Sequence, residues 1–204
     1  MYYSFFCLFF TTLSCCVTPK PLRSKIVSTE PLISEHGGYK ELESFQVARL
    51  LYDLTLRFCN RYIDKRNRSH DRMVQEAIST VQNIVKGSLV SATSKTTELE
   101  LNRVARESLE ELRLDYEGFL RQNNMNVWPY DDRRRKTLTD RKCATVDEVA
   151  LWVLQKHKRQ SAERSSFAPP LPEIFANAAI TLTIDACSLL NRQINTLEKR
   201  FGTK

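Results

Sequence analysis

The stretch DRMVQEAISTVQNIV (residues 71–85) places its apolar side chains mostly three or four residues apart. This spacing is typical of an α-helix with one apolar face, because one helical turn takes about 3.6 residues. Three other stretches repeat it. The four stripes consist of Val47, Leu50, Leu51, Leu54, Phe58 and Tyr62; Met73, Val74, Ala77, Ile78, Val81, Ile84 and Val85; Leu101, Val104, Ala105, Leu109, Leu112, Tyr116 and Phe119; and Ala179, Leu182, Ala186, Leu190, Ile194, Leu197 and Phe201. Four such helices bury their stripes by packing around one core. The sequence therefore predicts an all-α protein, an antiparallel up-down four-helix bundle.

Polar and glycine-containing breaks set the predicted ends of these helices. We expect bundle helices over residues 39–65, 70–90 and 94–123, and a fourth from Pro172 to about Phe201. Proline suits the first turn of a helix, where the backbone N–H has no helical partner, and Gly202 is suited to end the last helix. The polar turn before residue 70 is short, which makes the first two helices antiparallel neighbours.

Residues 124–170 interrupt the pattern between the third and fourth bundle helices. Within them, Thr145 and Glu148 have the spacing of a capping box, in which both side chains accept hydrogen bonds from amides at the start of a helix. Val149, Trp152 and Val153 follow on one helical face. We therefore expect a short extra helix over 146–158, carried by the insert 124–170 of a bundle domain that spans residues 39–204.

Residues 1–38 make up a separate apolar and irregular extension. Its apolar part, residues 2–17, has the length of a signal-peptide core, but no Lys or Arg precedes it and no small-residue cleavage site follows. A signal peptide, a disordered extension and a wrongly assigned start codon all stay open. Isolated cysteines suit a reducing compartment. We therefore expect a cytoplasmic protein, with secretion or a periplasmic location as the alternative if residues 1–17 act as a signal peptide.

The net charge of +7 is concentrated in the insert, because residues 121–170 hold 11 basic and six acidic side chains. Clustered lysines and arginines attract the phosphates of a polyanion, and exposed aromatic rings stack on unpaired bases. The alternative is that the charges are solvated while the tryptophans pack against the bundle. On the first interpretation, Trp128 and Tyr130 stack on bases, and the phosphate-binding residues are Arg133, Arg134, Arg135, Lys136, Arg141, Lys142, Lys156, Lys158 and Arg159.

The sequence contains no pattern that points to catalysis, a cofactor or a metal. Its six cysteines include no CxxC pair and its three histidines include no HxxxH pair. The glycine patterns of phosphate-binding and dinucleotide-binding loops are also absent. Glu107, Glu110 and Glu111 lack the ExxH companions that di-metal bundles need, so we interpret them as solvent-facing or interface residues. We expect a protein that is not an enzyme and has no cofactor or small-molecule substrate.

Four asparagines, Asn83, Asn102, Asn177 and Asn191, lie beside apolar positions of the four predicted bundle helices. An unpaired buried amide costs about 1–3 kcal/mol. We therefore expect these side chains either to form a hydrogen-bond network that fixes the register of the helices, or to face solvent or another subunit.

Several short motifs occur in the order found in a bacterial protein family. They are Phe45–Ala48 (FQVA), Asp71–Ala77 (DRMVQEA), Val81–Ile84 (VQNI), Thr93–Lys95 (TSK), Arg106–Leu112 (RESLEEL), Ala176–Ala178 (ANA) and Leu190–Gln193 (LNRQ). This order resembles the four-helix-bundle family of ribosomal-RNA intervening-sequence proteins and of the accessory variability determinant of diversity-generating retroelements, over about residues 37–201. The segments around Trp128–Pro129 and Thr145–Val153 resemble the inserted region of a subgroup known only as four-helix bundle suffix proteins.

The resemblance implies a ring-like homopentamer with a basic surface and without catalytic residues. The retroelement member binds nucleic acid and a reverse transcriptase, so RNA, DNA and such an enzyme are the partners that the resemblance implies. This chain departs from the family pattern by its long insert and its apolar N-terminus. We expect a self-assembling scaffold that binds nucleic acid electrostatically. The alternative is a protein-interaction module with no nucleic-acid role, which would use the Trp128–Tyr130 region and the helix at 146–158.

Overall fold

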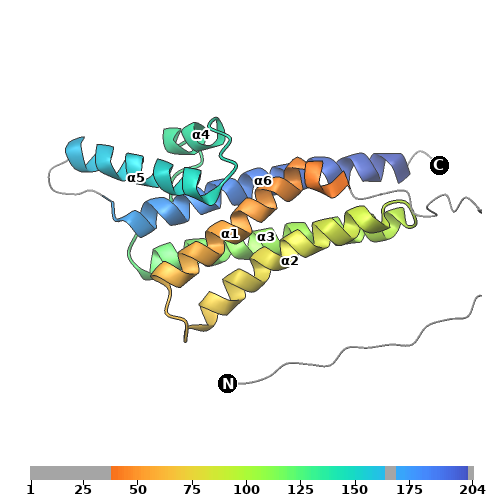
Figure 1. Cartoon of the computed structure of the whole chain (residues 1–204), viewed down its shortest axis with the longest axis horizontal. Coiled ribbons are helices and arrows are strands. Elements are labelled where there is room, and N and C mark those ends of the chain that lie inside the picture. The colour runs from red at the N-terminus through yellow and green to blue at the C-terminus, as the bar shows by residue number, and fades with distance from the viewer. Residues whose placement is uncertain (1–37, 164–168, 202–204) are drawn as a thin grey trace, which may run out of the picture. The chain divides into compact units, whose positions relative to one another are not determined.

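A computed structural model describes residues 38–163 and 169–201 of the chain (Figure 1). A short 3-10 helix, η1 (Gly38–Glu41), precedes α1 (Glu43–Tyr62), α2 (Arg68–Val90) and α3 (Lys95–Gln122). Two further helices, α4 (Arg133–Thr139) and α5 (Val146–Glu163), lead to α6 (Leu171–Phe201). These described ranges contain no β-strand, so the predicted all-α class is confirmed. The predicted N-terminal extension lies outside the described residues, apart from its last residue.

The four longest helices contact one another in a closed series of pairs. α1 contacts α2, α2 contacts α3, α3 contacts α6, and α6 contacts α1. The residues of the four predicted apolar stripes lie mostly on the faces that meet. Those that the structure describes are largely buried or half-buried. Val104 is the exception, because 42% of its surface is exposed on the outer face of α3.

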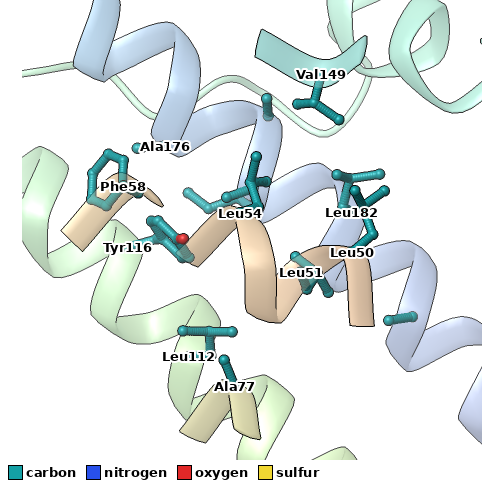
Figure 2. Packing of buried hydrophobic residues seen from close by; sticks show 14 of the residues in the cluster. Leu50, Leu51, Leu54, Phe58, Ala77, Leu112, Tyr116, Val149, Ala176 and Leu182 are labelled. Carbon is teal, nitrogen blue, oxygen red and sulfur yellow. The ribbon is translucent and has the colours of Figure 1, made fainter. Parts of the chain in front are cut away.

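Aromatic rings fill the centre of the core. The ring of Phe58 packs against those of Tyr62, Tyr116, Phe119 and Phe175, with ring centroids 5.2, 5.0, 4.9 and 5.7 Å away. Figure 2 shows Phe58 and Tyr116 among the buried leucines and alanines that surround them. The hydroxyl of the fully buried Tyr116 donates to Thr55 Oγ1 at 3.0 Å, which satisfies a polar group that burial would otherwise leave unpaired.

Helices α2 and α3 approach each other closely at Gly87. A Cβ at this position would lie 3.5 Å from both the Glu98 carbonyl oxygen and the Leu101 Cβ. A methyl group would still fit here at an ordinary contact distance, whereas a longer side chain would meet α3.

The described part of the insert, residues 124–163 and 169–170, contains two helices where the sequence predicted one. The unpredicted helix, α4, begins at the cap residue Asp132, whose carboxylate accepts from the Arg134 backbone N–H at 2.8 Å. Helix α5 begins as expected but runs to Glu163, beyond the predicted end at residue 158. The Glu148 N–H donates to Thr145 Oγ1 at 3.3 Å, while the Glu148 carboxylate accepts from the Ala144 N–H at 2.8 Å, one residue earlier than a standard capping box. Both insert helices pack on α6, and α5 also contacts α1.

Helix α6 is the most apolar of the helices. By length and composition alone, its segment Leu171–Arg200 would be able to cross a membrane. However, 78% of the most apolar window of this segment is buried inside the protein, as is usual for the central helix of a helical core. Helices α1 and α3 and the two insert helices, α4 and α5, cover it.

Candidate functional site

Asn177 of α6 anchors the start of the insert. Its amide oxygen accepts from the Trp128 backbone N–H at 2.7 Å, and its amide nitrogen donates to the Asn126 carbonyl at 2.8 Å and to the Glu173 carbonyl at 2.9 Å. The side chain is fully buried. One amide therefore fixes the backbone of residues 126–128 against the core helix.

Of the two arrangements predicted for the four asparagines, a hydrogen-bond network between helices and amides that face solvent or another subunit, the network does not form. Asn83 and Asn102 donate to carbonyls of their own helices, at Ser79 and Glu98, and Asn191 is exposed. Only Asn177 bonds to a distant segment, and that segment is the insert. Its role lies in positioning the candidate site rather than in setting the register of the helices.

Two tryptophans and two cations hold the insert together. The Arg134 guanidinium carbon lies 4.2 Å from the ring centroid of Trp128, and the Trp128 and Trp152 rings meet edge to face with centroids 6.3 Å apart. On the other side, Lys156 Nζ lies 5.3 Å from the Trp152 ring centroid. Each cation is attracted by the negative face of an aromatic ring. This series of contacts joins α4, the segment before it and α5.

Trp128 and Arg135 are not available to a ligand, which corrects two of the predicted contacts. Only 2% of Trp128 is exposed, so its ring does not stack on a base in this arrangement. Arg135 is also buried, and its Nη2 donates to the Trp128 carbonyl at 2.6 Å. Burial lowers the pKa of this guanidinium, the negative charges of Asp132 and Glu117 partly offsetting that effect. Both side chains hold the insert in place instead of contacting phosphates or bases.

Four of the eight other predicted phosphate-binding residues line a cleft of about 520 Å³ beside α5, which we call the basic cleft. Among the described residues that line it, none is acidic and four are cations. The lining residues are Thr137, Arg141, Trp152, Gln155, Lys156, Lys158 and Arg159. Arg141 reaches α5 from the loop after α4, where its Nη1 donates to Gln155 Oε1 at 3.1 Å.

The electrostatics of the basic cleft are those of crowded like charges. Burial lowers the pKa of Lys156, and the positive charges of Arg159, Arg133 and Arg134 lower it further, while the negative charge of Asp132 offsets part of this effect. These cations therefore lie close enough to Lys156 to repel its charge, although Arg133 and Arg134 do not line the cleft itself. A cleft with this field attracts anions.

Arg134 is less available to an anion than its neighbours. Its guanidinium donates to both carboxylate oxygens of Asp132, through Nη2 at 2.7 Å and through Nε at 3.0 and 3.2 Å. This contact holds the pKa of Asp132 below its usual range. Arg134 therefore adds to the field around Lys156 while its hydrogen bonds are directed at Asp132.

Three further predicted residues, Lys136, Tyr130 and Lys142, do not line the basic cleft. Lys136 and Tyr130 are exposed, Tyr130 to 85%, and neither is among the residues that line it. Tyr130 is thus the one predicted stacking residue that solvent, and a base, can reach. Lys142 lines a different cleft, where its backbone has a φ of 48°, an uncommon conformation for a residue with a side chain.

This second cleft, which we call the apolar groove, was not predicted from the sequence. It has a volume of about 550 Å³ and lies where α1, α4 and α6 meet. Its apolar lining consists of Val47, Leu50, Leu138, Cys143, Ala144, Leu182 and Leu189. At its side, Thr139 Oγ1 donates to Asp185 Oδ2 at 2.8 Å, and burial raises the pKa of Asp185. Periodicity does not reveal such a groove, because its residues come from separate elements.

The described residues offer no metal site or activated thiol. No three His, Cys, Asp or Glu side chains of residues 38–163 and 169–201 are grouped so that they would hold a metal ion. Burial raises the pKa of Cys59 and of Cys187 to about 12, so both thiols stay protonated at neutral pH. The third cysteine of this part of the chain, Cys143, is half-buried, and its pKa is raised as well.

Comparison of the whole chain with protein-family models, with curated proteins and with solved structures found no match.

Proposed function

We propose that this protein is a non-enzymatic scaffold that binds nucleic acid electrostatically through the basic cleft. The observation that carries this proposal is the composition of that cleft, in which Arg141, Lys156, Lys158 and Arg159 converge and none of the described lining residues is acidic. Phosphate contacts supply most of the sequence-independent affinity for nucleic acid, because each neutralised phosphate releases bound counterions. The exposed ring of Tyr130 is the part of the insert best suited to stack on an unpaired base.

We also propose that α1, α2, α3 and α6 form an antiparallel four-helix bundle. The closed series of contacts between them supports this arrangement. So do the short connections from α1 to α2 and from α2 to α3, since a short link reverses the chain direction between neighbouring helices. In Figure 1 the colour gradient runs in opposite directions along successive members of this group. Helices α4 and α5 are then additions on the α6 side.

The resemblance to the ribosomal-RNA intervening-sequence and accessory-variability-determinant family extends the proposal to self-assembly. On this basis the subunits form a ring-like homo-oligomer, a pentamer, with a reverse transcriptase as a protein partner to be tested. Apolar side chains available for subunit contacts are present on the outer surface of α2 and α3, where Leu89, Val104 and Leu114 are 53%, 42% and 56% exposed. A cytoplasmic location is consistent with the three cysteines of the described residues, which are all unbridged.

The test compares two double variants that remove the same charge. Lys156→Gln/Arg159→Gln removes two cations from the basic cleft, and Lys142→Gln/Arg192→Gln removes two from the apolar groove. Fluorescence anisotropy would measure binding of labelled single- and double-stranded RNA and DNA at low salt, and light scattering would give the oligomeric state. We expect the first variant to lose about tenfold or more in affinity, equivalent to about 1.4 kcal/mol, and the second to lose much less. Equal losses, or no binding by the unaltered protein, would contradict the proposal.

A second function, protein binding without a nucleic-acid role, is favoured by one observation. Leu151 and Leu154 are 50% and 45% exposed on the outer face of α5, an unusual position for two neighbouring leucines. Because Trp128 is buried, the protein-binding surface would consist of α5 and Tyr130 without the Trp128 ring. It predicts that Leu151→Ser/Leu154→Ser abolishes partner binding while the charge variants have no effect. Leu56→Ser, at an exposed position of α1, is the control.

A further inference from the structure

The positive charge of the basic cleft is compact rather than spread along the surface. Lys156, Lys158 and Arg159 fall within one turn of α5, and Arg141 converges on them from the loop after α4. Two further cations, Arg133 and Arg134, are close enough to lower the pKa of Lys156. The remaining predicted phosphate contacts, Lys136 and Lys142, do not line this cleft.

A compact group of cations and an extended row of cations bind ligands that differ in the spacing of their negative charges. Duplex DNA spreads its charge along the helix, about one negative charge per 1.7 Å of axis, so a protein that follows a duplex needs cations along an extended track. A cleft of about 520 Å³ admits only a small part of such a backbone. Directly linked phosphates bring several negative charges into the same small volume.

Two of the four cleft cations already have a partner before any ligand binds. Lys156 Nζ lies over the Trp152 ring, and Arg141 donates to Gln155 at the surface. Because these contacts restrict the two side chains, an anion that binds them loses less conformational entropy than one that binds unrestrained surface lysines. Relief of the repulsion between Lys156 and its neighbouring cations adds to the favourable free energy of binding.

We infer that the basic cleft binds a run of directly linked phosphates, such as a triphosphate, in preference to the isolated phosphodiesters of a nucleic-acid chain. The same chemistry is presented by the 5′-triphosphate end of an RNA, by a free nucleoside triphosphate and by inorganic polyphosphate. This inference takes from the proposed function that ligands bind in the basic cleft. It adds which phosphate groups the cleft binds most tightly.

The experiment uses one short RNA sequence with three different 5′ ends, a hydroxyl, a monophosphate and a triphosphate, each labelled at the 3′ end. Binding to the full-length protein is measured by anisotropy at constant ionic strength, with inorganic tripolyphosphate and ATP as competitors. We expect the triphosphate RNA to bind about tenfold more tightly than the hydroxyl RNA. We also expect that Lys156→Gln/Arg159→Gln removes this difference while Lys142→Gln/Arg192→Gln preserves it.

The competitors distinguish the sources of the phosphates. Displacement by tripolyphosphate and ATP at similar concentrations indicates that the phosphate chain alone is recognised. Much tighter binding of the triphosphate RNA than of either competitor indicates that the cleft recognises an RNA end. Either result supports the inference.

The remaining outcomes separate this inference from the proposed function. Equal affinity for the three RNAs, without displacement by tripolyphosphate, overturns the inference and leaves nucleic-acid binding intact. Binding of tripolyphosphate without binding of the hydroxyl RNA supports the inference and overturns binding of a nucleic-acid chain. If none of these ligands binds, both are overturned.

Discussion

The guanidinium of Arg134 covers the indole ring of Trp128 at 4.2 Å from the ring centroid while it donates hydrogen bonds to the carboxylate of Asp132. This contact fixes the start of α4 against the segment that Asn177 ties to the core. Lys156, which lines the basic cleft, lies in the same series of ring contacts, because its Nζ is 5.3 Å from the Trp152 ring centroid.

Replacement of Arg134 by alanine removes both contacts, and we expect the insert to lose about 1–2 kcal/mol of stability. The chain has only two tryptophans, both in the insert, so denaturation followed by tryptophan fluorescence reports on this region alone. Arg133→Ala, at the exposed neighbouring position, is the control and should leave the fluorescence transition unchanged. Identical transitions for the two variants would show that the contact over Trp128 does not stabilise the insert.

Replacement of Asn177 by alanine leaves the buried Trp128 N–H without its hydrogen-bond acceptor. The cost of such an unpaired group is about 1–3 kcal/mol, and we expect a loss of that size in chemical denaturation. Asn191→Ala, at an exposed position of the same helix, should change the free energy of unfolding by less than about 0.5 kcal/mol. If the two substitutions cost the same, Asn177 does not anchor the insert.

Gly87 offers a test of the packing between α2 and α3. An alanine methyl group would lie 3.5 Å from its nearest neighbours, an ordinary contact distance. Gly87→Ala should therefore stabilise the protein by about 0.5–1 kcal/mol through its better helix propensity, as should Gly118→Ala in open space on α3. Gly87→Leu should destabilise it by about 1–3 kcal/mol, because the larger side chain meets α3. A leucine tolerated at position 87 would mean that the two helices are further apart than described.

Asp185 should make stability depend on pH. Burial raises its pKa above the usual 3.8, and the Thr139 hydroxyl and the Arg135 charge offset only part of that effect. A carboxyl group whose pKa is higher in the folded than in the unfolded protein lowers the free energy of unfolding when it ionises. This loss of stability is absent below the unfolded-state pKa and complete above the folded-state pKa. Asp185→Asn should therefore gain stability relative to the unaltered protein at pH 7 and gain less at pH 3.5. Urea denaturation at both pH values measures the difference, and a larger gain at acid pH would refute this account.

Helical spacing predicted the all-α class because burial of an apolar stripe governs where a long helix lies. It failed at Val104, whose place on the buried side of α3 is taken by Asn102, 1% exposed. Asn102 lies next to Gly87, where its amide nitrogen would be 3.7 Å from an added Cβ. The close approach of α2 at Gly87 encloses this polar residue, and apolar periodicity alone does not predict such a pairing.

The sequence indicates which residues of the candidate site are basic but not where their side chains point. A run of four cations, Arg133–Lys136, shows no apolar period, so α4 was missed. Arg135 and Leu138 lie three residues apart on the buried face of that helix, and this spacing was a signal that Arg135 points inward. The apolar groove had no comparable signal, because residues from α1, α4 and α6 line it only after the chain has folded.

The salt dependence of nucleic-acid binding tests the role of the basic cleft most directly. Four cleft cations that each neutralise a phosphate of a single strand predict a slope of log K against log [salt] of about −3, since each contact contributes about −0.7. We predict that Lys156→Gln/Arg159→Gln reduces this slope to about −1.4, because two contacts are lost. Lys142→Gln/Arg192→Gln should leave it near −3. A slope that is the same for the cleft variant and the unaltered protein would contradict the account.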